Sequence, residues 1–393
     1  MTTVAESDAG AAGESGRPLF VELFLDLVYV FALVSLTKML TGNLSWTGLA
    51  RGLVLLLAFA LIWALTTWAG GSSAVARPSV QAHIIATAAA GLVMAAAAPH
   101  AFGDRGLLFA GTYVFIHFGS IIYFLLVAPS PAMPRRTARI AFWEAIAAIG
   151  WISGAFSEGP VRLGLWAAAA AVEYTTAALG WPVPGLGRSR SMEWQLGGER
   201  VPERYRQFVV VAFGVSILTT GTTFSQNEYT LDRGYALAVV FTIVVLMWRI
   251  YIYRAGELLT EAIARSPDPA LLTRAAAVCH LVMVAGIGGV AVTSDLVVVR
   301  PFGDTPPSWA AVVLGGPALF LIGRGLLDYT VFGRISRSRV LGLVLLAGAA
   351  PASSVLPPVL VALLAVIVLA LIAVANLVAT RLHPRVPAPP AFG

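Results

Sequence analysis

Apolar stretches of about twenty residues recur along the whole chain, and they constrain its fold more than any other feature. An α-helix needs roughly 20 mostly apolar residues to cross the hydrocarbon core of a bilayer. Only 12% of the 393 residues are charged and 58% are hydrophobic, whereas a soluble domain has about 25% charged residues. The sequence therefore predicts an all-α, polytopic transmembrane helix bundle and excludes a soluble enzyme, a nucleic-acid-binding module and a disordered scaffold. Twelve segments qualify as spans, at about 19–40, 50–69, 79–98, 106–128, 138–156, 160–181, 207–224, 234–253, 275–293, 309–327, 339–355 and 358–380.

Prolines and one long connection divide this series. Pro351, Pro357 and Pro358 interrupt the last apolar stretch, so eleven spans, with a re-entrant or kinked final pair, stay open beside twelve. The longest connection, over 182–206, contains several Pro and Gly residues and separates two groups of six spans. This division is compatible with an internal repeat. The predicted organisation is a disordered cytoplasmic tail over 1–18, a first half over 19–181, a cytoplasmic loop over 182–206, a second half over 207–380 and a cytoplasmic tail over 381–393.

The basic residues orient the predicted spans. Alternate loops assign 18 Arg residues to one side and 5, Arg162 among them, to the other, while three basic residues fall within spans. Cytoplasmic loops are enriched in Lys and Arg, so we expect a multi-pass cell-membrane protein with both termini in the cytoplasm. The net charge of +6 is dispersed between apolar runs, so the expected partners are membrane lipids and not nucleic acid. The single Cys279 excludes an internal disulfide.

A few ionisable side chains lie inside the predicted spans, where each costs at least about 2.5–3.5 kcal/mol. In the first span, Glu22, Asp26 and Tyr29 follow at spacings of four and three and share one helix face. Two adjacent carboxylates in a poor dielectric favour a proton donor beside an acceptor. Alternatively, each carboxylate pairs with a basic residue from another span, and the two interpretations are compatible. The full set is Glu22, Asp26, Lys38, His83, His117, Glu144, Glu173, Arg249, His280 and Arg324.

The other charged positions also allow purely structural interpretations. The in-span histidines could contribute a metal site together with carboxylates, but their spacing carries no local ligand motif. Hydrogen-bonded structural roles are therefore expected for His83 and His117, and no metal is predicted. Arg249 lies beside interfacial aromatics and either extends toward the lipid headgroups or serves as counter-ion to Asp26. Arg324 and Asp328 lie four residues apart and can satisfy each other.

Three stretches of the sequence resemble the bacterial low temperature requirement protein A family. Residues 17–32 contain Glu-Leu-Phe-Leu-Asp-Leu-Val-Tyr-Val, where the family typically has Glu-Leu-Phe-Phe-Asp-Leu-Val-Phe-Val. Residues 203–218 and the His-Leu-Val-Met-Val-Ala-Gly-Ile of 280–287 are also similar. The resemblance implies a multi-pass bacterial membrane protein whose molecular activity is not established for the family. It carries proposed functional positions over to Glu22, Asp26, Glu203, Arg204 and His280.

The chain departs from the family pattern at two acidic positions. Val215 stands where the family usually has Glu, and Tyr253 stands where an Asp is common. Together with the basic Arg249, these changes imply an altered site charge and a specialised or divergent activity.

Three functions fit these observations. The first is a membrane-embedded, cofactor-free enzyme that isomerises or cyclises an apolar small molecule such as an isoprenoid or lipid. Asp26 or Glu22 would be its general acid/base and His280 the partner, with the remaining site residues in supporting roles. The second is a proton-coupled small-molecule transporter, and the third a non-catalytic membrane stress-adaptation protein. The predicted substrate-binding residues are Tyr29, Trp143, Trp248 and Tyr251, and the predicted ion-pairing residues are Glu203, Arg204, Arg249 and Arg324.

Overall fold

The computed structural model describes residues 20–69, 77–127, 133–189, 200–253 and 255–382. These residues are helical or in connections, apart from an isolated antiparallel bridge between Val183 and Gly187. The predicted tail over 1–18, residues 383–393 of the other tail and residues 190–199 of the predicted loop lie outside the described residues. The chain divides into two compact units, residues 1–39 with 49–204 and residues 40–48 with 205–393.

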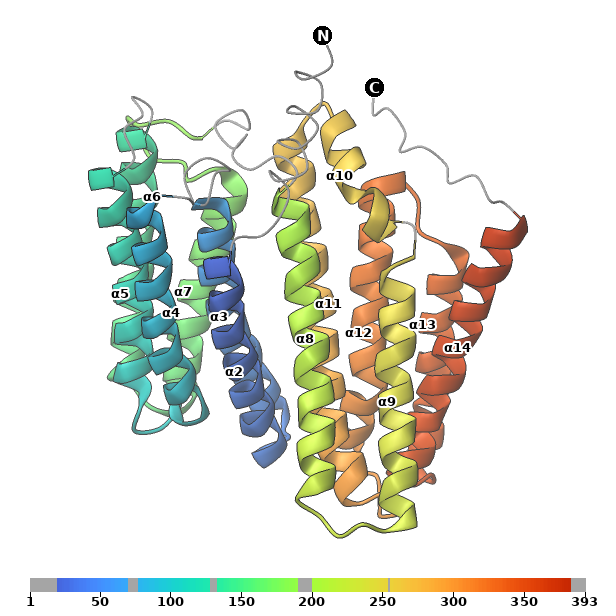
Figure 1. Cartoon of the computed structure of the whole chain (residues 1–393). Coiled ribbons are helices and arrows are strands. Elements are labelled where there is room, and N and C mark those ends of the chain that lie inside the picture. The colour runs from blue at the N-terminus through green and yellow to red at the C-terminus, as the bar shows by residue number, and fades with distance from the viewer. Residues whose placement is uncertain (1–19, 70–76, 128–132, 190–199, 254, 383–393) are drawn as a thin grey trace. The chain divides into compact units, whose positions relative to one another are not determined.

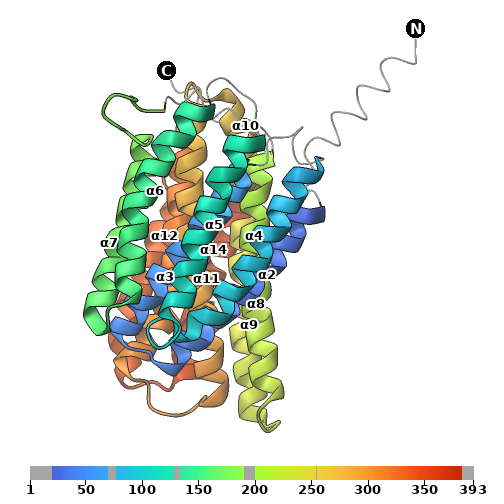
Figure 2. The ribbon, with the colours of Figure 1, turned by 90° about the vertical axis from the view of Figure 1, so that its left-hand side faces the viewer.

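The first unit contains six long helices joined by short connections. Helices α4 to α7 pack in chain order, each against the next (Figures 1 and 2). Tyr29 packs edge-on against Phe59 with ring centroids 6.4 Å apart, and the Tyr174 hydroxyl donates to the Leu57 carbonyl at 2.9 Å. These contacts join the first two helices to each other and to the last. The elements are α2 (Phe20–Gly42), α3 (Trp46–Ala69), α4 (Pro78–Ala97), α5 (Gly106–Val127), α6 (Met133–Ala155) and α7 (Gly159–Leu179).

Arg162 fastens the connections at one end of this unit. Its guanidinium donates to the carbonyls of Gly154 and Ala155 at the end of α6, of Ser157 just after it, and of Ala101 and Gly103 before α5. Carbonyls at helix ends have no partner within the helix, and this cation satisfies five carbonyls while staying 5% exposed. From the sequence, Arg162 counted only among the loop Arg residues that orient the spans in the membrane. In the structure it also fixes the ends of α5, α6 and α7.

The second unit is built around two helices in close contact. A Cβ at Gly286 of α11 would lie 2.5 Å from the backbone nitrogen of Phe320 in α12, so only glycine permits this approach. Helix α14 packs against α9 and α13, and α9 also contacts α11 (Figure 1). The elements are α8 (Arg200–Ser225), α9 (Leu231–Tyr251), α10 (Ala255–Arg265), α11 (Pro269–Val299), α12 (Pro307–Phe332), α13 (Arg337–Ala349) and α14 (Pro358–Leu382).

Helix α10 was not predicted from the sequence. Its eleven residues are too few for a span, so a search for apolar runs treats the segment as a loop. Leu259, Ala262 and Ile263 are buried while Glu261 and Arg265 are exposed. Apolar residues at spacings of three and four are the amphipathic signal that could have found it.

Nine of the described helices are long and apolar enough to cross a membrane, by length and composition alone: α2, α3, α4, α5, α8, α9, α11, α12 and α14. Helices α6 and α7 also match predicted spans but are less apolar, partly because they carry Glu144 and Glu173. The thirteen residues of α13 extend about 20 Å, short of a hydrocarbon core of about 30 Å. The predicted count of about twelve spans is therefore not confirmed, although a helix lies at each predicted position.

The contact between α11 and α12 predicts opposite effects at two glycines of one helix. Gly286→Ala should lower the Tm of the detergent-solubilised protein, because overpacking costs about 1–3 kcal/mol. Gly288→Ala should leave Tm unchanged or raise it, since nothing lies within 4 Å of a Cβ there. An equal rise in Tm in both variants, measured by thermal unfolding, would contradict this packing.

Candidate functional site

Asp26 is held in a buried ion pair. Its Oδ2 accepts from Arg204 Nη1 at 2.7 Å and its Oδ1 from Arg204 Nη2 at 3.0 Å. Trp63 contributes twice, because its indole N–H donates to Asp26 Oδ1 at 3.2 Å and its ring lies 5.4 Å from the Arg204 Cζ. A bidentate guanidinium–carboxylate pair is among the strongest side-chain hydrogen-bond arrangements. The counter-ion is thus Arg204, which the resemblance had singled out, and not Arg249.

The other residues of the first-span motif are also buried. Glu22 is 5% exposed and Tyr29 4% exposed. Glu203, the neighbour of Arg204, is only partly buried. The predicted catalytic roles of Glu22 and Asp26 stay predictions, and what the geometry adds is a structural role for Asp26 between α2, α3 and the start of α8.

His280 has both ring nitrogens engaged. Its Nδ1 lies 2.7 Å from the Ala276 carbonyl, and because a carbonyl only accepts, this nitrogen is the donor. Its Nε2 lies 3.3 Å from the Tyr251 hydroxyl, which can donate to it when the imidazole is neutral. The Tyr205 ring is 5.3 Å away, centroid to centroid. This is the environment of a histidine whose hydrogen-bonding needs are met within the second unit.

The remaining predicted substrate-binding residues lie in different surroundings. The Trp143 indole donates to the Pro182 carbonyl at 2.9 Å, which ties α6 to the segment after α7. Trp248 is 46% exposed on the surface of α9, and the adjacent Arg249 is exposed and makes no ion pair among the residues that the structure describes. Both fit a helix surface that faces lipid and headgroups.

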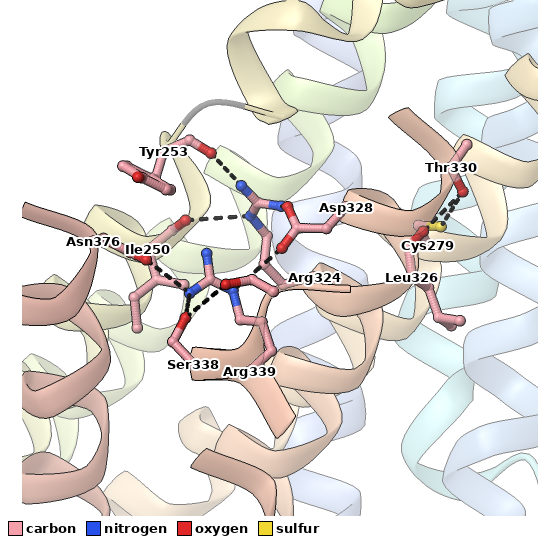
Figure 3. A network of polar contacts seen from close by, with 11 residues as sticks. Ile250, Tyr253, Cys279, Arg324, Leu326, Asp328, Thr330, Ser338, Arg339 and Asn376 are labelled. Atoms are coloured by element: carbon pink, nitrogen blue, oxygen red, sulfur yellow. Dashed lines mark hydrogen bonds and ion pairs between the residues drawn. The ribbon is translucent and has the colours of Figure 1, made fainter. Parts of the chain in front are cut away.

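Arg324 centres a polar network in the second unit (Figure 3). It pairs with Asp328 as the spacing of four predicts, and it also donates to the carbonyls of Ile250 and Tyr253 at the end of α9. Asp328 Oδ2 lies 3.6 Å from Arg339 Nε, and Arg339 Nη1 donates to Asn376 Oδ1 at 3.2 Å. The network therefore joins α9, α12, α13 and α14.

A third group of buried charges gathers on α5, α6 and α7. His117, Glu144 and Glu173 each offer one potential ligand atom, and these three atoms lie within 4.8 Å of one another. His117 Nδ1 is 2.7 Å from Glu144 Oε2. The three residues are 3%, 6% and 3% exposed. No other group of three or more His, Cys, Asp or Glu side chains among the described residues meets this criterion.

Aromatic side chains hold this cluster in place. The Tyr113 hydroxyl donates to Glu173 Oε2 at 2.9 Å, and the Trp151 indole donates to Glu173 Oε1 at 3.2 Å. The Tyr113 ring packs on His117 at 4.3 Å and on Trp151 at 4.6 Å, centroid to centroid. Trp166 packs on Trp151. It also lies against Gly154, where an added Cβ would be 2.4 Å from the Trp166 ring.

Sequence analysis named all three residues but did not bring them together. Their separations along the chain carry no motif, and His117 was expected to be a structural histidine. A usable signal was the position of each residue along its helix. His117 is residue 12 of 22 in α5, Glu144 is residue 12 of 23 in α6, and Glu173 is residue 15 of 21 in α7. Three consecutive antiparallel helices with an ionisable group near each midpoint place these groups at one level.

The ion pair between Asp26 and Arg204 predicts a large loss of stability when one partner is removed. Asp26→Asn and Arg204→Gln should each lower the free energy of unfolding by roughly 3–5 kcal/mol, because an uncompensated charge stays buried. The double variant should lose less than the sum. Chemical unfolding in detergent measures all three.

The matched control is the exposed pair of Glu261 and Arg265, whose side chains are 42% and 52% exposed. Glu261→Gln should cost about 0.2–1 kcal/mol. Losses of the same size in the Asp26 or Arg204 variants would show that the buried pair is not a structural support.

Comparisons with known proteins place the chain in a family and identify a relative. The family described as Bacterial low temperature requirement A protein (LtrA) matches residues 18–374. An uncharacterized protein of Rhizobium meliloti (strain 1021) is 33% identical over 307 residues, which cover 77% of this chain and 75% of that protein. No solved structure matches. Because this family model matches most of the chain, the chain belongs to the bacterial low temperature requirement A protein family.

Proposed function

We propose that this membrane protein is a proton-coupled carrier in which His117, Glu144 and Glu173 bind and release the proton together. The supporting observation is the burial of these three groups with ligand atoms within 4.8 Å of one another. When both carboxyl groups are ionised and the imidazole is neutral, the three side chains carry a charge of −2. Such a charge is costly in a helix bundle surrounded by hydrocarbon, so the cluster needs protons or another cation to compensate it.

The cluster acts as one titrating unit. Groups this close share their protons, and a proton belongs to the set and not to one member. Glu144 faces His117, while Glu173 is fixed by the Tyr113 and Trp151 donors. Gain or loss of one proton changes the buried net charge by one unit, and in a low-dielectric interior this change is large enough to bias the packing of α5, α6 and α7. Chains of Asp, Glu and His residues form the proton relays of membrane pumps and transporters.

The enzyme alternative has less support. An acid/base enzyme acting on an isoprenoid or lipid needs an acid free to donate, whereas both Asp26 oxygens accept from Arg204 and both His280 nitrogens are engaged. An open groove of about 510 Å³ lies between α12 and α13 in the second unit. Ser353 is the one polar side chain in its lining, beside residues such as Leu314 and Leu346, so this groove offers no acid or base.

The transport proposal predicts a proton flux that depends on the cluster. Inverted membrane vesicles that hold a pH gradient would receive fractions of a cell extract, the inorganic ions included, while a pH-sensitive dye is followed. At least one fraction should dissipate the gradient in the wild type. Glu144→Gln and Glu173→Gln should abolish this response, because each removes an exchangeable carboxyl group.

The matched control for the flux is Glu158→Gln. Glu158 is exposed and precedes α7, the helix that carries Glu173. This variant should respond like the wild type. Equal dissipation in all variants, or none with any fraction, would overturn the proposal.

We further propose that both termini face the cytoplasm of the cell, as the distribution of 18 against 5 Arg residues favours. This arrangement requires an even number of crossings, so that one or all three of α6, α7 and α13 cross beside the nine candidate spans.

Terminal fusions test this topology. A green fluorescent protein at either end should fluoresce, because it matures in the cytoplasm. Alkaline phosphatase at either end should be inactive, because it requires export. Active phosphatase at one terminus would mean an odd number of crossings.

A further inference from the structure

We infer that His117, Glu144 and Glu173 bind one divalent transition-metal ion, of the Zn²⁺ and Mn²⁺ class, in exchange for protons. The inference rests on the proposed function in one respect: the ion is then the solute that the carrier exchanges for protons. It names a site between α5, α6 and α7 of the first unit and a chemical class of ligand.

The donor set suits such an ion. Zn²⁺ takes imidazole nitrogen and carboxylate oxygen ligands, and three protein ligands commonly leave a further position open. An ion at the centre of a triangle with 4.8 Å edges would lie about 2.8 Å from each corner. Zn–N and Zn–O bonds measure about 2.0–2.2 Å, so the three ligands need to close in by less than about 1 Å, which side-chain rotation supplies.

His117 has coordination capacity that the protein itself does not use. Its Nδ1 lies 2.7 Å from Glu144 Oε2, so one ring nitrogen already contacts a carboxylate that would share the ion. Its Nε2 is buried and makes no hydrogen bond with the described residues. A buried polar atom without a hydrogen bond costs free energy. A metal ion between the imidazole and the two carboxylates would use the lone pair that is left over.

The surroundings of Glu173 resemble the outer shell of a metal site. Ligating carboxylates are usually oriented by hydrogen bonds from a second layer of residues. Tyr113 and Trp151 each donate to one oxygen of Glu173, and each oxygen keeps a second lone pair for an ion. The Tyr113 ring also packs on His117, so one residue orients two of the three ligands.

Charge and donor type together select the ion. A divalent cation neutralises two carboxylates beside a neutral imidazole, whereas a monovalent ion leaves a net negative charge in the bundle. An imidazole ligand favours Zn²⁺ and other transition metals over Mg²⁺ and Ca²⁺, which prefer oxygen ligands alone. Because only a neutral imidazole and ionised carboxylates ligate, uptake of the ion releases the extra protons that the three groups hold before it binds.

Metal binding to the purified full chain tests the inference. The protein, stripped by a chelator in detergent, would be titrated with Zn²⁺ and with Co²⁺ as a spectroscopic probe, in weak buffer with a pH indicator. We expect one ion per chain, release of protons on binding and no comparable binding of Mg²⁺. His117→Gln and Glu144→Gln remove direct ligands, so each should weaken binding by more than the about 10–100-fold that substitution of an outer-shell residue costs.

His83→Gln is the matched control, because His83 lies in the same unit and stacks on Tyr123 outside the cluster. Wild-type affinity in this variant supports the assignment, and equal loss in all three variants overturns it. Thermal unfolding of each variant separates misfolding from loss of a ligand, and proton release by the wild type tests the site without any substitution. Absent binding together with a flux that depends on Glu173 overturns this inference alone. Binding together with no such flux overturns the proposed function alone.

Discussion

The cost of a charge in hydrocarbon governs this structure. Few ionisable groups are tolerated inside such a bundle, and each must find its compensation within the protein. Asp26 finds it in Arg204 and Trp63, and Arg324 finds it in Asp328 and the carbonyls at the end of α9. Arg162 satisfies five carbonyls in two connections. Of these, the Arg162 contacts fix the ends of α5, α6 and α7, the helices that carry His117, Glu144 and Glu173.

The cluster differs from the other buried charges in its balance. Asp26 faces one guanidinium, and Asp328 faces two, so neither leaves negative charge without a fixed cation. His117, Glu144 and Glu173 combine two acids with one weak base. Together these three groups are neutral only when they hold two additional protons or a divalent metal ion. A site whose neutrality depends on an exchangeable cation suits a carrier better than a structural support.

The sequence predicted the helices well because their signal is local. Runs of about twenty apolar residues placed a helix at each predicted position, and the spacing of four between Arg324 and Asp328 predicted their ion pair. Helix α10 was missed because an amphipathic segment of eleven residues does not stand out in hydropathy. The prolines at 351, 357 and 358 predicted an interruption of the last apolar stretch, and α13 does end at Ala349 before them. The prolines alone did not decide whether this stretch forms a kinked pair or two separate helices, because that depends on packing.

The candidate site was harder to predict, because its residues come from three helices and no local pattern links them. Glu22 and Asp26 drew attention as a stripe on one helix, yet the partner of Asp26 lies 178 residues away. Arg204 came from the family resemblance and not from spacing. His117 was expected to be a structural histidine, and only the structure shows that it lies against Glu144 and close to Glu173. Helix depth was the usable signal, and it requires the antiparallel order of α5, α6 and α7.

As a proton carrier, the protein must hold an exchangeable proton on His117, Glu144 and Glu173 inside the bundle. Infrared difference spectroscopy on the purified chain measures this proton directly, through the carbonyl stretch of a buried protonated carboxylic acid that appears on acidification. We expect this band in the wild type and in Glu158→Gln, and its loss when Glu144→Gln and Glu173→Gln are combined in a folded protein. An unchanged band in the combined variant would mean that the cluster does not hold this proton.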